Sequence, residues 1–85
     1  MMTELNDAPF YRSYLLNRTI YLHELKKLSN DELHMLNVDT LAALNEARFR
    51  YDQIEDKQSE AAGGEYRRIK VAGYFQAAIR LELDN

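Results

Sequence analysis

The chain of 85 residues contains no cysteine and no tryptophan, and it has only one proline and three glycines. Without cysteine it forms no disulfide and offers no thiolate for catalysis or metal binding. His23 and His34 have no second histidine at helical spacing, so we expect neither a metal site nor a cofactor. Gly63-Gly64 is not followed by the Lys-Ser/Thr of a phosphate-binding loop. We therefore expect that the protein is not an enzyme.

Long hydrophobic runs are also missing. No apolar stretch approaches the roughly 18 residues that a membrane-spanning helix needs. The first nine residues, MMTELNDAP, are polar and acidic, unlike a secretory signal peptide. We expect a soluble cytoplasmic protein without membrane association. We also expect a single helical domain over residues 1–85, with residues 1–6 as a flexible tail.

Apolar periodicity predicts a first helix from about Ala8 to Leu28. Asp7-Ala8-Pro9 is typical of a helix start, because proline is tolerated in the first turn. Eight residues share one helical stripe: Phe10, Tyr11, Tyr14, Leu15, Tyr21, Leu22, Leu25 and Leu28. Arg18 falls in this stripe, where it either pairs with a carboxylate at the edge of the core or contacts a partner. Leu16 and Ile20 fall outside the stripe, either as a contact patch or packed on another segment.

A capping box at Ser29–Glu32 predicts the start of a second, short helix over about residues 30–36. In this motif the serine hydroxyl and the glutamate carboxylate each accept a hydrogen bond from the other residue's backbone N–H. Residues 37–39 are expected to turn into a longer helix, with Asp39 as its N-cap.

Two long helices folded back on each other are predicted over about residues 39–62 and 65–83. Gly63-Gly64 is expected to form the turn, because glycine readily adopts the left-handed conformation that ends helices. A connection this short favours an antiparallel αα-hairpin. The fold-back would place Gly73 near Ile54, where the missing side chain would let the backbones pack closely. The predicted fold is all-α, a small three-to-four-helix bundle without strands.

The last helix is apolar on more than one side. Ile69, Ala72 and Ile79 lie on one face, whereas Val71 and Phe75 lie on another. Such a helix is usually buried on both sides. It is therefore either the central helix of the domain or half of a homodimer interface through residues 66–83, and the sequence leaves both interpretations open.

Basic and tyrosine residues on the hairpin are the candidate partner-binding residues: Arg48, Arg50, Tyr51, Tyr66, Arg67, Arg68, Lys70 and Tyr74. Together they would form a basic patch with interleaved aromatic rings, able to meet phosphates or an acidic protein. The alternative is a solvated surface with ion pairs. Glu46–Arg50 and Arg48–Asp52 have helical i,i+4 spacing, and Arg67 is expected near Glu60 across the turn.

The functional hypothesis from sequence is a non-enzymatic protein-binding module, a small regulator, adaptor or inhibitor that docks on a larger macromolecule. Exposed tyrosine and arginine are typical of contact hot spots. The alternative hypothesis is a nucleic-acid-binding regulator that uses the Arg48/Arg50 and Arg67/Arg68/Lys70 clusters. The net charge of −3 weakly disfavours this alternative.

Overall fold

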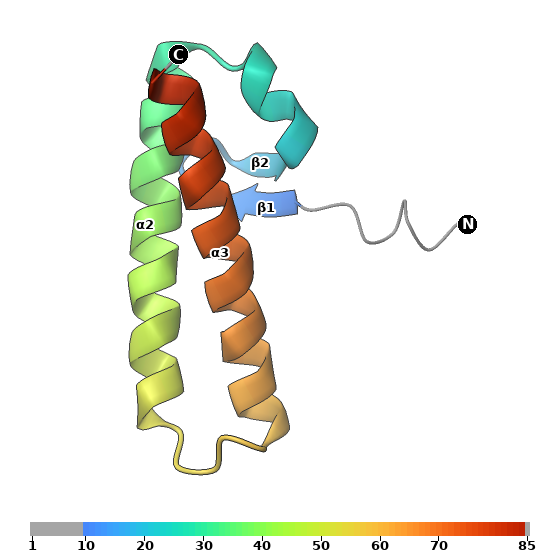
Figure 1. Ribbon diagram of the computed structural model, residues 1–85, viewed down its shortest axis with the longest axis vertical. Coiled ribbons are helices and arrows are strands. Elements are labelled where there is room, and N and C mark those ends of the chain that lie inside the picture. The colour runs from blue at the N-terminus through green and yellow to red at the C-terminus, as the bar shows by residue number, and fades with distance from the viewer. Residues whose placement is uncertain (1–9, 85) are drawn as a thin grey trace, which may run out of the picture.

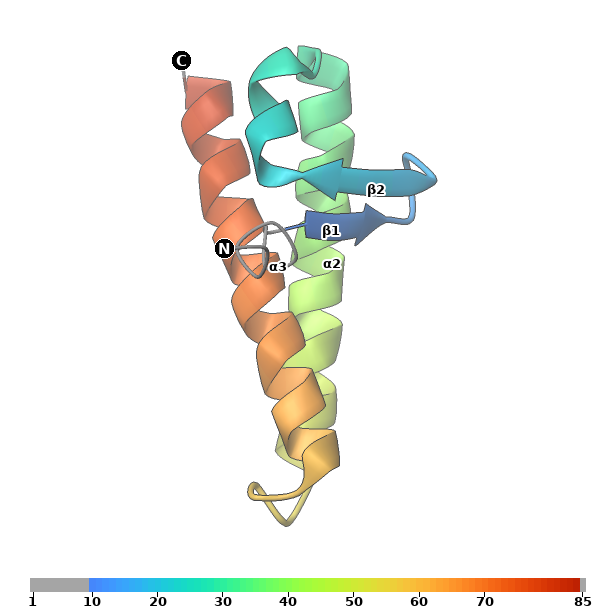
Figure 2. The ribbon, with the colours of Figure 1, turned by 90° about the vertical axis from the view of Figure 1, so that its right-hand side faces the viewer.

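Two long antiparallel helices form the body of the protein, and a small β-hairpin and a 3-10 helix lie against one side of them. The computed structural model describes residues 10–84. The element order is β1 (Phe10–Ser13), β2 (Arg18–Tyr21), η1 (Leu22–Lys27), α2 (Asn30–Gln53) and α3 (Glu60–Asp84). The β-hairpin and η1 cover the end where α2 begins and α3 ends, whereas the end near the connecting loop extends beyond them (Figures 1 and 2).

The prediction of a first helix is wrong for residues 10–21, which form two strands and a turn. Residues 22–27 are helical, but as a short 3-10 helix and not as the end of a long α-helix. The predicted start at Ala8 lies outside the described residues. β1 and β2 pair antiparallel, with Tyr11 opposite Ile20. Side chains along β1 alternate, so that Tyr11 and Ser13 are buried while Phe10 and Arg12 are exposed. This period of two is the strand pattern. The prediction that the fold has no strand is therefore also wrong.

The residues that fitted the helical stripe poorly have clear places in the hairpin. Ile20 is completely buried, and Leu16 packs at the edge of the core. Arg18 is exposed on β2 and its guanidinium pairs with Glu24 at 3.2 Å. In the turn between the strands Asn17 has a φ of 57°, a left-handed conformation that asparagine tolerates better than most residues.

The capping box is confirmed, but the helix that it starts does not end at residue 36. Glu32 N–H donates to Ser29 Oγ at 3.1 Å, and Ser29 N–H donates to Glu32 Oε1 at 2.9 Å. The helix continues to Gln53 without the predicted turn at residues 37–39. No glycine or proline interrupts it there.

Asp39 lies in the middle of α2 and is not an N-cap. Its carboxylate accepts three hydrogen bonds from the β-hairpin: from the Tyr11 hydroxyl at 2.7 Å, the Ser13 hydroxyl at 2.8 Å and Leu15 N–H at 2.9 Å. Ser13 Oγ in turn accepts from Leu16 N–H at 3.0 Å. Asp39 is only 8% exposed, so this network fastens the hairpin to the helix from inside the protein.

The chain folds back at residues 54–59, so the prediction of a turn at Gly63-Gly64 is wrong. Lys57 Nζ donates to the carbonyls of Tyr51 and Ile54 and neutralises the C-terminal end of α2. Ser59 Oγ accepts from Ala62 N–H at 3.2 Å and caps the start of α3. Lys57 and Ser59 thus provide hydrogen-bond partners for backbone groups at the end of α2 and the start of α3. Both glycines lie within the first turns of α3.

The earlier turn also changes which residues of the two helices meet. Gln76 donates a hydrogen bond to Asn37 Oδ1, and the rings of Tyr51 and Tyr66 lie 6.2 Å apart. A Cβ built on Gly73 would meet no atom within 4 Å. The predicted close packing of the helices at Gly73 is therefore wrong.

The core lies where the β-hairpin, η1 and the two helices meet. Its buried residues are Tyr11, Ile20, Leu25, Leu33, Leu36, Phe75 and Ile79. The predicted pair of long antiparallel helices is confirmed in its general form, and the protein is mostly helical. The predicted three-to-four-helix bundle is wrong, because the first quarter of the described chain forms a β-hairpin and a single 3-10 helix.

The Asp39 network predicts a distinct response to acid. Burial raises the pKa of Asp39, but hydrogen bonds from Leu15, Tyr11 and Ser13 outweigh it and hold the pKa below its ordinary value. The contribution of this carboxylate to stability is complete above the unfolded pKa of about 3.9, and it is lost as the pH falls through the lower folded pKa. Asp39→Asn should lower the free energy of unfolding at neutral pH by about 2 kcal/mol.

Urea unfolding followed by circular dichroism, repeated from neutral to acidic pH, measures both effects. Asp39→Asn should lose less stability on acidification than the wild type, because it lacks the titrating carboxylate. Asp52→Asn, an exposed change on the same helix, serves as the control. Identical acid dependence of the wild type and Asp39→Asn would contradict this role for Asp39.

The open surroundings of Gly73 predict a stabilising substitution. Gly73→Ala should raise the free energy of unfolding by about 0.5–1 kcal/mol, since alanine restricts the unfolded chain and meets no obstacle in the helix. Gly63→Ala, also in α3 and also unobstructed, should behave similarly. Thermal denaturation measures both, and a lower melting temperature for Gly73→Ala would instead support close helix packing.

Candidate functional site: an arginine-rimmed groove

A groove of about 650 Å³ lies where β1 meets α2 and α3. Its floor and walls are mainly apolar: Phe10, Tyr11, Ala43, Ala47, Gly64, Val71 and Ala72. Ala43 and Ala47 are one turn apart on α2 and face Val71 and Ala72 of α3 across the helix pair. Because alanine and glycine have so little side chain, the two helices leave a depression between them at this level.

Four arginines line this arginine groove, and they come from three different elements. Arg12 is on β1, Arg50 on α2, and Arg67 and Arg68 on α3. Among the lining residues that lie within 10–84, Glu46 is the one carboxylate. The lining therefore carries an excess of positive charge, although the chain as a whole has a net charge of −3.

Three of the four guanidinium groups have hydrogen-bond partners among residues 10–84; the contacts of Arg12 and Arg50 are exposed, whereas the Glu65 side chain beside Arg68 is only 14% exposed. Arg50 pairs with Glu46 at 3.1 Å, as predicted, and Arg68 pairs with Glu65 at 3.1 Å. Arg12 donates to Asn17 Oδ1 at 3.4 Å. Exposed pairs of this kind contribute about 0–1 kcal/mol each. A partner's carboxylate or phosphate can therefore displace the exposed contacts of Arg12 and Arg50 at little cost, and it can form bidentate hydrogen bonds with the same guanidinium groups. The Arg68–Glu65 pair is held more firmly, because Glu65 is largely buried and its Oε1 has no hydrogen-bond partner within residues 10–84.

The structure brings together only part of the predicted set. Arg50, Arg67 and Arg68 meet in the arginine groove, but Arg48 lines a separate hollow with Gly73 and Arg80. The predicted pairs Arg48–Asp52 and Glu60–Arg67 are not among the ion pairs that residues 10–84 form with one another. The prediction that Arg48 and Arg50 act as one cluster is not supported by this arrangement.

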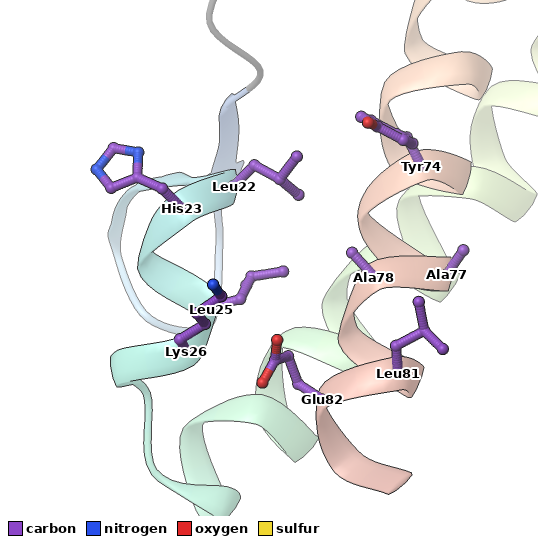
Figure 3. Close-up of a pocket in the computed structure, with 9 residues that line it drawn as sticks. All are labelled: Leu22, His23, Leu25, Lys26, Tyr74, Ala77, Ala78, Leu81 and Glu82. Carbon is purple, nitrogen blue, oxygen red and sulfur yellow. The ribbon is translucent and has the colours of Figure 1, made fainter. Parts of the chain in front are cut away.

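Tyr51, Tyr66 and Lys70 form a different group, toward the end of the helices near the connecting loop. Tyr51 and Tyr66 contact each other, Lys57 Nζ lies 4.6 Å from the centre of the Tyr51 ring, and Lys70 Nζ lies 5.7 Å from that of Tyr66. These are cation–π distances. Tyr74 is on α3 beside η1, in a third hollow (Figure 3). The predicted basic and aromatic patch is thus divided among several places.

Sequence reasoning missed Phe10, Tyr11 and Arg12. They were assigned to a helix, where Arg12 has no relation to residues fifty positions later in the chain. The alternation of buried and exposed residues in FYRS was the available signal, but four residues are too few to distinguish a strand from part of an amphipathic helix.

Comparison with protein-family models, curated proteins and solved structures found no match for this chain. Residues 10–84 contain no cluster of three or more His, Asp or Glu side chains that could hold a metal ion. None of the helices in that same range is both long and apolar enough to cross a bilayer.

The contacts of Lys57 predict that this residue stabilises the fold. Lys57→Met removes the ammonium group that two carbonyls at the end of α2 accept from, and it should lower the free energy of unfolding by about 1 kcal/mol. Lys70→Met is the matched control, because within residues 10–84 Lys70 has only the longer contact with the Tyr66 ring. Chemical denaturation measures both variants, and equal stabilities would contradict a capping role for Lys57.

Proposed function

We propose that this protein is a non-enzymatic protein-binding module that docks an acidic, amphipathic segment of a larger partner in the arginine groove. Such a module acts as a regulator, adaptor or inhibitor of its partner. The observation that supports the proposal is the local reversal of charge: four arginines surround an apolar floor in a chain that is acidic as a whole.

The composition of the groove suits a peptide that presents both carboxylates and apolar side chains. The planar guanidinium group binds a carboxylate through two parallel hydrogen bonds, and long-range attraction speeds the encounter. The floor of alanine and valine side chains accepts apolar anchors, and Phe10 and Tyr11 add aromatic contact area at the β1 end. An amphipathic helix laid into a groove is a common form of such recognition.

A nucleic acid can form the charged contacts with the arginines but not the apolar contacts with the floor of the groove. Phosphates would meet the arginines, but the apolar floor would remain uncovered by a charged backbone. Arg48 and Lys70, which the nucleic-acid hypothesis requires, are not among the residues that line the groove. These two points favour a protein partner.

A labelled peptide with glutamate and leucine at helical spacing tests the proposal. Fluorescence anisotropy should show binding to the wild type. Arg50→Glu/Arg67→Glu should weaken the binding at least about tenfold, because carboxylates then face carboxylates. The matched control is Arg48→Glu/Arg80→Glu, which makes the same charge change on the same two helices outside the groove. It should change the affinity by no more than about twofold.

Two further probes separate the alternatives. A peptide with glutamine in place of leucine should bind less tightly if the apolar floor contributes. A DNA duplex should bind more weakly than the acidic peptide does. Duplex binding that is lost with Arg50→Glu/Arg67→Glu, together with no binding of the acidic peptide, would contradict the proposal and support the nucleic-acid alternative.

A further inference from the structure

The nine residues that precede β1 have the composition of the partner segment proposed for the arginine groove. MMTELNDAP contains two carboxylates, Glu4 and Asp7, and no lysine or arginine. Met1 and Leu5 are four positions apart, and Glu4 and Asp7 are three apart, so apolar and acidic residues each recur at helical spacing. The chain therefore carries an acidic, amphipathic segment of its own.

The residue to which this segment is joined is part of the groove wall. Phe10 is the first residue of β1 and lines the arginine groove. An extended chain spans at most about 3.6 Å per residue, so Asp7 can reach about 11 Å from Phe10 and Glu4 about 22 Å. Ala43 and Arg50 are the first and last groove residues of α2, and seven residues of helix are about 10 Å long. The whole groove is therefore within reach of residues 1–9.

We propose that residues 1–9 occupy the arginine groove of their own chain and compete with the partner for it. This inference rests on the proposed function, since it assigns the regulation of the same groove. The carboxylates of Glu4 and Asp7 pair with guanidinium groups at the rim, and the Leu5 side chain covers part of the apolar floor. The partner gains access by displacing this segment.

Charge and tethering both favour this occupant. The segment has two negative charges, and the groove lining within residues 10–84 has four arginines and one carboxylate. Arg67 forms no ion pair with another residue of 10–84, so a carboxylate from outside this range meets its guanidinium without displacing a neighbour. A short tether also raises the effective concentration to the millimolar range, where weak contacts suffice to hold the segment.

Occupation by its own segment makes the groove more selective. A ligand that binds only the open groove has its apparent dissociation constant raised by the inverse of the open fraction. A partner with more carboxylates or larger apolar anchors than residues 1–9 overcomes this competition, whereas a weakly acidic sequence does not.

Charge reversal in the segment tests the competition in the full chain. Glu4→Lys/Asp7→Lys should tighten the binding of the labelled acidic peptide at least about threefold, because lysines no longer pair with the arginine rim. Asp52→Lys/Glu55→Lys is the matched control, since it makes the same change of net charge at exposed positions outside the groove. It should change the affinity by less than about 1.5-fold at physiological salt. Equal affinities of the two double variants would overturn the proposal.

Leu5→Gln tests the apolar contact without a change of charge. It should tighten peptide binding about twofold, since the floor then has a weaker competitor. Leu41→Gln is the matched control, because Leu41 is an exposed leucine of α2 that does not line the groove. A Leu5→Gln variant that binds the peptide no more tightly than Leu41→Gln would contradict the contact between Leu5 and the floor.

A spin label locates the segment without any peptide. The chain has no cysteine, so Thr3→Cys takes a single nitroxide. The label should broaden the amide NMR signals of Ala43 and Ala47 in the groove far more than those of Asp56 and Leu81, which lie outside it. Uniform broadening would overturn the proposal. Selective broadening of an unlabelled copy mixed with labelled protein would also overturn it, because the segment would then occupy the groove of a second copy.

This inference and the proposed function can fail separately. Selective broadening of Ala43 and Ala47 in a protein that binds no acidic peptide would contradict the proposed function alone. Peptide binding that depends on Arg50 and Arg67 but is unaffected by every change in residues 1–9 would contradict this inference alone.

Discussion

The hydrogen bonds from Tyr11 and Ser13 to Asp39 are the interaction on which the rest of the structure depends. A two-stranded hairpin of four-residue strands is at best marginally stable alone. Here a buried carboxylate in the middle of α2 accepts from two side chains and one backbone N–H of that hairpin. Burial and the hydrogen bond to Asp39 raise the pKa of Tyr11, because a phenolate would lie buried beside a carboxylate. The buried carboxylate is tolerated because both of its oxygens accept hydrogen bonds.

The same anchor creates the arginine groove. Holding β1 against the helix pair brings Phe10 and Arg12 to one side of the depression that small residues leave between α2 and α3. Three of the four arginines come from the helices, and the fourth arrives with the strand. The groove is therefore a property of the packing between the hairpin and the helices, and neither part has it alone.

Part of this arrangement could be predicted from the sequence because the signals are local. The capping box at Ser29 needs only residues three positions apart, and the buried residues of both long helices recur at helical spacing over several turns. The Glu46–Arg50 pair and the grouping of Arg67 with Arg68 follow from helical spacing. The position of the turn could not be predicted in the same way. Gly63-Gly64 carries the strongest breaking signal, but Lys57 and Ser59 satisfy the helix ends earlier, and the glycines are absorbed into α3.

The sequence by itself determined the two long helices in their general form, the capping box at Ser29 and the basic residues that the helices display. The tertiary structure alone decided that residues 10–21 form strands, that Asp39 is an anchor, and which arginines share a surface. The physical reason is range. Helix caps and helical periodicity act over a few residues, whereas Asp39 and Tyr11 are 28 positions apart. The local pattern of residues 10–21 fits a helix and a strand almost equally well, and the hydrogen bond to Asp39 stabilises the strand.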